Sequence, residues 1–130
     1  QSGPHGTVVA DIICTIAPQV ELYSADVFGP TGGTNVETVI EALRHCVEVA
    51  KCRIVNLSLG VPESKLTPSQ RSHFYRAIED AYFHDVLVIA AASNDHPVTK
   101  SYPAAYSPPL ISVNKGLFAD PMQFQYLLDH

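Results

Sequence analysis

Apolar residues recur at three- and four-residue spacing in three stretches of the chain, which is the pattern of a helix with one apolar face. The stretches cover residues 8–16, 36–50 and 68–82. Their apolar positions are Val8, Val9, Ile12, Ile13 and Ile16, then Val36, Val39, Ile40, Leu43, Val47 and Ala50, and finally Phe74, Ala77, Ile78, Ala81 and Tyr82. The spacing predicts three helices, the last of which buries its apolar face.

Residues at the ends of these stretches indicate where the helices begin and end. Thr34-Asn35-Val36-Glu37 is a capping-box pattern that opens the second helix. Thr67 precedes Pro68, a residue favoured at the first helical position, and the Gln70 side chain is placed to reach back to the cap. Pro18 ends the first helix, because the residue before a proline is pushed out of the α region.

Short apolar runs between the helices predict four strands, at residues 21–28, 52–59, 86–91 and 110–113. The run over 86–91 is the most apolar, and we expect it to be covered on both faces. Loops or polar connections are expected at 29–33, 61–66 and 93–107. Strands that alternate with helices predict an α/β fold with a parallel sheet flanked by helices.

Length and composition limit what this chain can be. Its 130 residues are one domain's worth, and 46% are hydrophobic, enough to bury a core. A net charge of −5, with eight scattered Lys and Arg residues, argues against nucleic acid as a partner. No apolar run approaches the roughly 20 residues of a membrane span, so no membrane partner is expected. No signal peptide is visible, which predicts a cytoplasmic location.

The cysteines and histidines give no metal-ligand spacing, so neither a metal nor another cofactor is expected. Three cysteines, Cys14, Cys46 and Cys52, are an odd number. Free thiols in a reducing compartment are the preferred interpretation, and a disulfide between Cys46 and Cys52 is the alternative.

Residues suited to acyl-transfer chemistry follow the predicted strands. In parallel sheets, sites gather at the carboxyl ends of the strands, where Ser58-Leu59-Gly60 and Ala92-Ser93-Asn94 stand. Asn94 is a carboxamide that can donate to a developing oxyanion, or else an ordinary turn residue. His5 opens the first helix, where the positive end of the helix dipole favours a neutral imidazole that can act as a general base. Glycines Gly32 and Gly33 either let another chain approach or simply form a turn.

Four segments, in this order, resemble motifs of the subtilisin-like serine proteases. His5-Gly6-Thr7-Val8-Val9-Ala10-Asp11 resembles the histidine motif, and Ser58-Leu59-Gly60 resembles the end of the substrate-binding strand. Asn94 matches the oxyanion asparagine, and Tyr102-Pro103-Ala104-Ala105-Tyr106 resembles a segment found in many members. The resemblance covers residues 5 to 113 and implies a partial subtilase domain over residues 1–130, with a three-layer, Rossmann-like parallel sheet that is truncated.

The resemblance also assigns roles to individual residues. It implies that His5 and Asn94 are catalytic, and that an extended peptide or protein substrate lies against the segments 32–33, 58–60 and 92–93. The substrate-binding residues implied in this way are Gly32, Gly33, Ser58, Leu59, Gly60, Ala92 and Ser93. No motif supplies the triad aspartate or the nucleophilic serine, so the chain by itself is expected to be inactive.

Departures from the family pattern keep other functions open. Val8 replaces the second histidine of the motif, Asp11 its last glycine, and Ser93 the glycine before the oxyanion asparagine. These changes favour a non-catalytic pseudoprotease, a peptide-binding or scaffold module that keeps the subtilase sheet. A weaker alternative is a ligand-binding doubly wound domain, in which residues 29–34 cradle a phosphate. We also expect the chain to pair with a second copy, or with further subtilase segments from the same or another chain.

Overall fold

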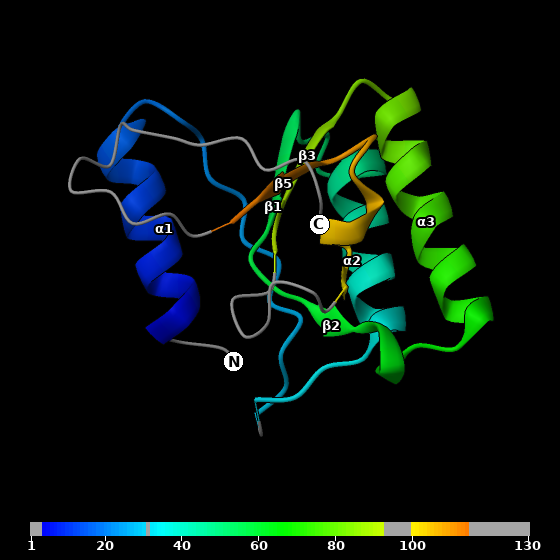
Figure 1. Ribbon diagram of the computed structural model, residues 1–130. Helices are drawn as coiled ribbons and strands as arrows, with labels where there is room; N and C mark the ends of the chain where they lie inside the picture. The colour runs from blue at the N-terminus through cyan, green and yellow to red at the C-terminus, as the bar shows by residue number, and fades with distance from the viewer. Residues whose placement is uncertain (1–3, 31, 93–99, 115–130) are drawn as a thin grey trace. The chain divides into compact units, whose positions relative to one another are not determined.

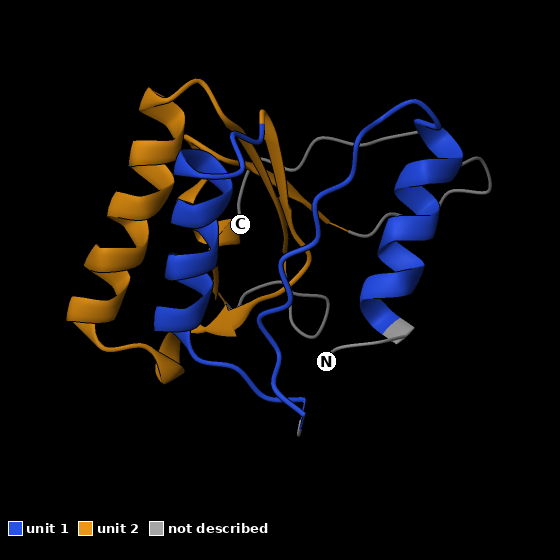
Figure 2. Cartoon of the chain, turned by 180° about the vertical axis from the view of Figure 1, so that it is seen from behind, with its two compact units in different colours: residues 1–52 blue, residues 53–130 orange. Residues whose placement is uncertain are grey.

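A computed structural model describes residues 4–30, 32–92 and 100–114. The chain divides into two units, residues 1–52 and 53–130, which Figure 2 shows in different colours. The first unit contains helices α1, Pro4–Ile16, and α2, Val36–Glu48. The second contains α3, Pro68–Phe83, and a sheet of three parallel strands in the order β1-β3-β5. This arrangement confirms the predicted α/β fold with a parallel sheet.

The strands of the sheet are β1, Ile54–Leu57, β3, Leu87–Ala91, and β5, Ile111–Val113. Strand β3 lies between the other two (Figure 1). Helix α3 connects β1 to β3 and packs against β3, which is the predicted strand–helix–strand unit. Three of the four predicted strands are therefore confirmed, each slightly shorter than its apolar run.

The predicted strand at residues 21–28 is wrong, because the structure assigns no strand there. Its apolar residues, Leu22, Tyr23, Val27 and Phe28, stand in adjacent pairs and do not alternate as a half-buried strand requires. The Asp26 carboxylate also accepts a hydrogen bond from the Phe28 backbone N–H at 3.1 Å. Such a local bond competes with the hydrogen bonds of a sheet.

Strand β3 is not covered on both faces, contrary to the prediction. Val88 and Ala90 are buried, whereas Leu87 and Ala91 are exposed. The registers pair Val55 with Val88, so these side chains share the buried face of the sheet. The opposite face carries Ile54, Leu87, Ile89, Ile111 and Val113. The burial of this strand therefore alternates from residue to residue, although its sequence is apolar throughout.

The helix boundaries follow their caps. Thr67 accepts a hydrogen bond from the Gln70 backbone N–H at 3.1 Å, and the Gln70 side chain accepts one from the Thr67 N–H at 3.0 Å, which confirms the predicted capping box. Helix α2 is capped by Asn35, which accepts from the Thr38 N–H at 2.9 Å. The cap is therefore Asn35 and not Thr34, the first residue of the predicted capping box. Asparagine is at least as good a cap as threonine.

Four short elements among the described residues of the second unit were not predicted. Strands β2, Val61–Pro62, and β4, Ser101–Tyr102, pair antiparallel, and 3₁₀ turns lie at Glu63–Lys65 and Ala104–Tyr106. Two-residue strands are too short to show an apolar period. None of the helices among the described residues is long and apolar enough to cross a membrane.

Candidate functional site

The carboxyl edge of the parallel sheet brings two of the predicted segments together. Leu57, the last residue of β1, pairs with Ala90 in β3. The segment Ser58-Leu59-Gly60 therefore leaves the sheet beside the end of β3, where Ala92 follows. The Ala92 backbone N–H donates to the Val113 carbonyl at 2.8 Å, which extends the pairing with β5 by one residue. The structure thus places Ser58–Gly60 and Ala92 at one edge.

The Ser58 hydroxyl oxygen accepts a hydrogen bond from the Asn56 carboxamide at 2.7 Å. Asn56 is exposed on the strand two residues earlier, so both side chains lie on the same face of the chain. Sequence reasoning missed Asn56, although a polar residue inside an apolar strand was a visible signal. The bond holds the Ser58 hydroxyl toward the strand.

Gly60 leaves its own backbone open. Among the described residues, a Cβ at this position would meet only the Ser101 side chain, at 3.6 Å, which is an ordinary van der Waals distance. Packing against that part of the chain therefore does not require glycine here. Because the residue is also exposed, another extended chain can approach its backbone.

Pairing of β2 with β4 fixes the residues that follow Gly60. Val61 pairs with Tyr102, Pro62 with Ser101, and the Glu63 N–H donates to the Lys100 carbonyl at 3.2 Å. The chain leaving β1 is therefore tied to the chain that arrives from residues 93–99. Those residues, Ser93 and Asn94 among them, lie outside the described part of the structure.

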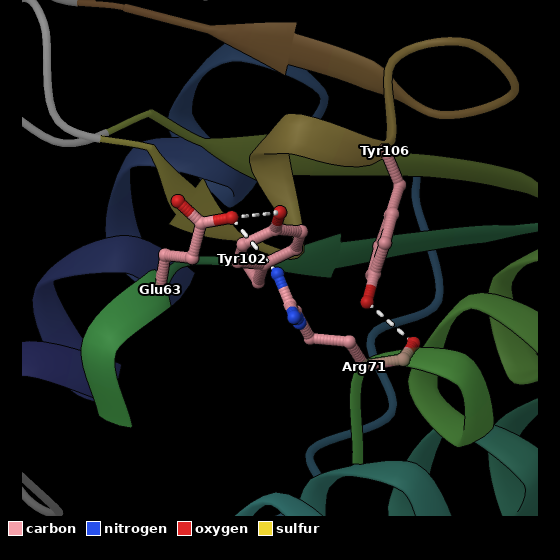
Figure 3. Close-up of polar contacts among 4 residues, drawn as sticks. All are labelled: Glu63, Arg71, Tyr102 and Tyr106. Atoms are coloured by element: carbon pink, nitrogen blue, oxygen red, sulfur yellow. Dashed lines mark hydrogen bonds and ion pairs between the residues drawn. The ribbon is translucent and has the colours of Figure 1, made fainter. Parts of the chain in front are cut away.

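A cluster of Glu63, Arg71, Tyr102 and Tyr106 holds this connection against α3 (Figure 3). Glu63 Oε1 lies 2.9 Å from Arg71 Nη1 and accepts a hydrogen bond from the Tyr102 hydroxyl at 3.3 Å. The Tyr106 hydroxyl donates to the Arg71 backbone carbonyl at 2.6 Å. The Tyr102 and Tyr106 rings lie 4.8 Å apart, and Tyr106 also meets the edge of Phe74. The cluster joins four elements of the second unit.

The pKa of Tyr106 is raised to about 12, chiefly by burial and in addition by the neighbouring Tyr102, while Arg71 acts to lower it. The phenol therefore stays protonated and keeps donating to Arg71 throughout the neutral and mildly alkaline range. The sequence contained this signal as Tyr102-Pro103-Ala104-Ala105-Tyr106, for which no structural role was predicted.

The two remaining predicted segments belong to the first unit. His5 is the second residue of α1 and is exposed, as the prediction of a helix N-terminus requires. Gly32 has φ +79°, a left-handed conformation that favours glycine, and its N–H donates to the Gly29 carbonyl at 2.9 Å. Gly33 is exposed and has open space at its Cβ position. Gly32 therefore forms a turn, and a substrate role for either glycine stays a prediction.

A model of the subtilase family matches residues 1–116. The chain belongs to the subtilase family. It is 33% identical over 112 residues to Subtilisin Savinase of Lederbergia lenta, and the aligned region covers 79% of this chain and 39% of that protein. Identity to the Alkaline protease of Shouchella clausii is also 33%, over 79% of this chain and 28% of the relative. For the Minor extracellular protease Epr of Bacillus subtilis (strain 168), it is 32% over 79% of this chain and 16% of the relative.

This subtilase chain thus spans well under half the length of these curated relatives. Family membership accounts for the order of the four motifs that the sequence displayed. The meeting of His5 with the sheet edge stays a prediction, because the two units are described separately. No group of three or more potential metal ligands occurs among the residues that the structure describes.

Proposed function

We propose that this subtilase chain supplies the general base and the oxyanion donor of a subtilisin-like serine endopeptidase. The observation that carries the proposal is the sheet register, which brings Ser58–Gly60 and the start of the Ala92–Asn94 segment to one edge. Family membership over residues 1–116 supports the roles that the motifs assign.

Each proposed residue has one chemical task. His5 accepts the proton of an attacking serine hydroxyl and later returns it to the leaving amine. The Asn94 carboxamide donates to the oxyanion of the tetrahedral intermediate without itself changing protonation state. No residue among the 130 is assigned as the nucleophile or the triad acid, so these two groups come from another part of the catalytic unit.

The substrate is proposed to be an extended peptide that pairs with the backbone beyond β1. An extended chain gains affinity from backbone hydrogen bonds along a strand edge, and side-chain pockets add specificity. Exposed Gly60 gives such a chain access to the backbone, and Gly32 and Gly33 are proposed to flank its other side.

Labelling with a fluorophosphonate and hydrolysis of casein test the proposal on the protein translated from the complete reading frame. We expect label and hydrolysis, and neither with the 130-residue chain. His5→Ala removes both. Asn94→Ala lowers kcat by about two to three orders of magnitude, the size known for oxyanion-hole donors in subtilisins.

His73→Ala is the matched control, because His73 is an exposed histidine on α3. It leaves labelling and hydrolysis unchanged. A complete protein that neither labels nor hydrolyses, or one that is unaffected by His5→Ala, would contradict the proposal.

A second candidate is a non-catalytic peptide-binding or scaffold module that keeps the sheet edge. Val8, Asp11 and Ser93, which depart from the family motifs, favour it. Titration calorimetry of the complete protein with extended peptides would then give binding that His5→Ala does not change and that Gly60→Val weakens. Hydrolysis of those peptides by the complete protein would exclude this candidate.

A further inference from the structure

Two cysteines meet where helix α2 ends. Cys46 lies in the last turn of the helix, and Cys52 follows after five residues. The Val49 and Ala50 N–H groups both donate to the His45 carbonyl at 2.9 Å, and Lys51 adopts φ +56°. The chain turns back there, and the Cys52 N–H donates to the Cys46 carbonyl at 2.8 Å.

This backbone hydrogen bond limits the distance between the two residues. The Cys46 carbonyl oxygen and the Cys52 nitrogen are 2.8 Å apart. Each of these atoms is held by covalent bonds close to its own Cα, so the two Cα atoms lie within roughly 7 Å of each other. A disulfide spans Cα distances up to about 6.8 Å. Both thiols are free, and Cys52 lies near enough to Cys46 to raise the pKa of its thiol.

The two thiols differ in exposure. Cys46 is 7% exposed, whereas Cys52 is partly exposed. Burial raises the pKa of the Cys46 thiol, and neighbouring Cys52 raises it further. Since the thiolate is the nucleophile, Cys46 is poorly suited to attack first. Cys52 is the accessible partner.

We propose that Cys46 and Cys52 form a redox modification site that a small-molecule disulfide, such as oxidised glutathione, converts into an intramolecular disulfide. The Cys52 thiolate attacks one sulfur of the reagent, and the other sulfur leaves as a thiolate that takes up the proton released by Cys52. Cys46 then attacks the Cys52 sulfur of the mixed disulfide and releases the second glutathione, which takes the Cys46 proton. The two protein thiols are oxidised, and one glutathione disulfide is reduced to two thiols.

Peptide mapping tests the site on the intact 130-residue chain. The reduced chain is incubated with oxidised glutathione in native buffer, alkylated and digested with trypsin without reduction. Trypsin cleaves after Arg44, Lys51 and Arg53, so the predicted disulfide joins peptide 45–51 to the dipeptide 52–53. We expect this joined species, while Cys14, which is exposed on α1, carries a glutathione adduct or the alkyl group.

Single substitutions separate the roles of the three cysteines. Cys14→Ser leaves the crosslink intact. Cys46→Ser leaves a glutathione adduct on Cys52 that no neighbouring thiol resolves, and Cys52→Ser leaves Cys46 unmodified until the chain is unfolded in urea. Separate adducts on Cys46 and Cys52, a crosslink to Cys14, or no reaction at either cysteine would each overturn the proposal.

Discussion

Helices α1 and α3 both carry apolar residues at helical spacing, yet they differ in what becomes of them. In α3, Phe74, Ala77, Ile78 and Ala81 are all buried. In α1, Val8, Ile12 and Ile16 are 56%, 53% and 67% exposed, and none of the described side chains of that helix is fully buried. Helix α1 is the more apolar of the two, yet its apolar side chains are less buried by the described part of the chain.

The difference lies in what each helix meets within its own unit. Helix α3 begins at a complete capping box, packs against β3, and meets the Tyr106 ring through Phe74. Neither helix has an acidic residue in its first turn or a basic residue in its last, so terminal charges do not distinguish them. Within α1, the Thr15 hydroxyl donates to the Asp11 carbonyl of the same helix, a bond that ties the helix to no other element. An apolar period therefore identifies a helix and its face, whereas burial depends on a second surface.

Phe74→Ala should have the largest effect, because Phe74 is 0% exposed and touches the Tyr106 ring. Loss of its transfer free energy and the cavity left behind should lower the free energy of unfolding by about 3–5 kcal/mol. Urea unfolding followed by circular dichroism measures this. Phe83→Ala at the exposed end of α3 is the control, and an equal loss there would break the contrast between buried and exposed positions.

Thr67→Ala tests how much the cap contributes to the difference between the helices. The substitution removes the hydroxyl that accepts from the Gln70 N–H, and it should lower the free energy of unfolding by about 1 kcal/mol. Thr67→Ser, which keeps the hydroxyl, should restore most of the loss. If Thr67→Ser is as unstable as Thr67→Ala, the cap is not the cause.

The parts of the fold that depend on local chemistry could be predicted from the sequence. The cap at Thr67, the buried positions of α3 and the parallel strands β1, β3 and β5 were all predicted. Tyr82 was wrongly placed on the buried face and is 58% exposed. The pairing of β2 with β4 depends on residues forty apart, and no local pattern reveals it.

The candidate site likewise has parts that the sequence predicted and parts that it did not. Motif and strand order placed Ser58–Gly60 and Ala92 at the same edge, and the register confirms that placement. The tyrosine cluster beside it was missed, since hydrogen bonds to Arg71 and Glu63 depend on tertiary packing. The roles of His5 and Asn94 stay predictions, as Asn94 lies outside the described residues and His5 belongs to the other unit.

Tyr106→Phe should have a smaller effect at neutral pH and a distinctive one in alkali. Loss of the 2.6 Å hydrogen bond to Arg71 should cost about 0.5–1.5 kcal/mol at pH 8. The pKa of Tyr106 rises from an ordinary 10.0 to about 12 on folding. Its stabilising contribution is therefore fully present below pH 10 and is lost as the pH rises through 12.

Urea unfolding at several pH values between 8 and 12 measures this dependence, over a window set by the two pKa values of Tyr106. Wild type should lose stability across the alkaline range, and Tyr106→Phe should lose less. Tyr82→Phe, which deletes an exposed phenol hydroxyl on α3, is the matched control and should follow wild type. Parallel curves for wild type and Tyr106→Phe would show that the phenol does not titrate in this way.

Ile12→Ser on α1 should have the smallest effect. Ile12 is 53% exposed, isoleucine and serine have similar helix propensities, and an exposed substitution changes the free energy of unfolding by no more than about 0.5 kcal/mol. Ile78→Ser, at a position that is 1% exposed, is the contrasting variant and should be severely destabilising. A cost above about 2 kcal/mol for Ile12→Ser would show that its face is covered in solution. Repeating the unfolding at a hundredfold lower protein concentration then identifies what covers this face. Stabilisation by a second copy of the chain depends on the logarithm of the protein concentration, whereas stabilisation by a segment of the same chain does not.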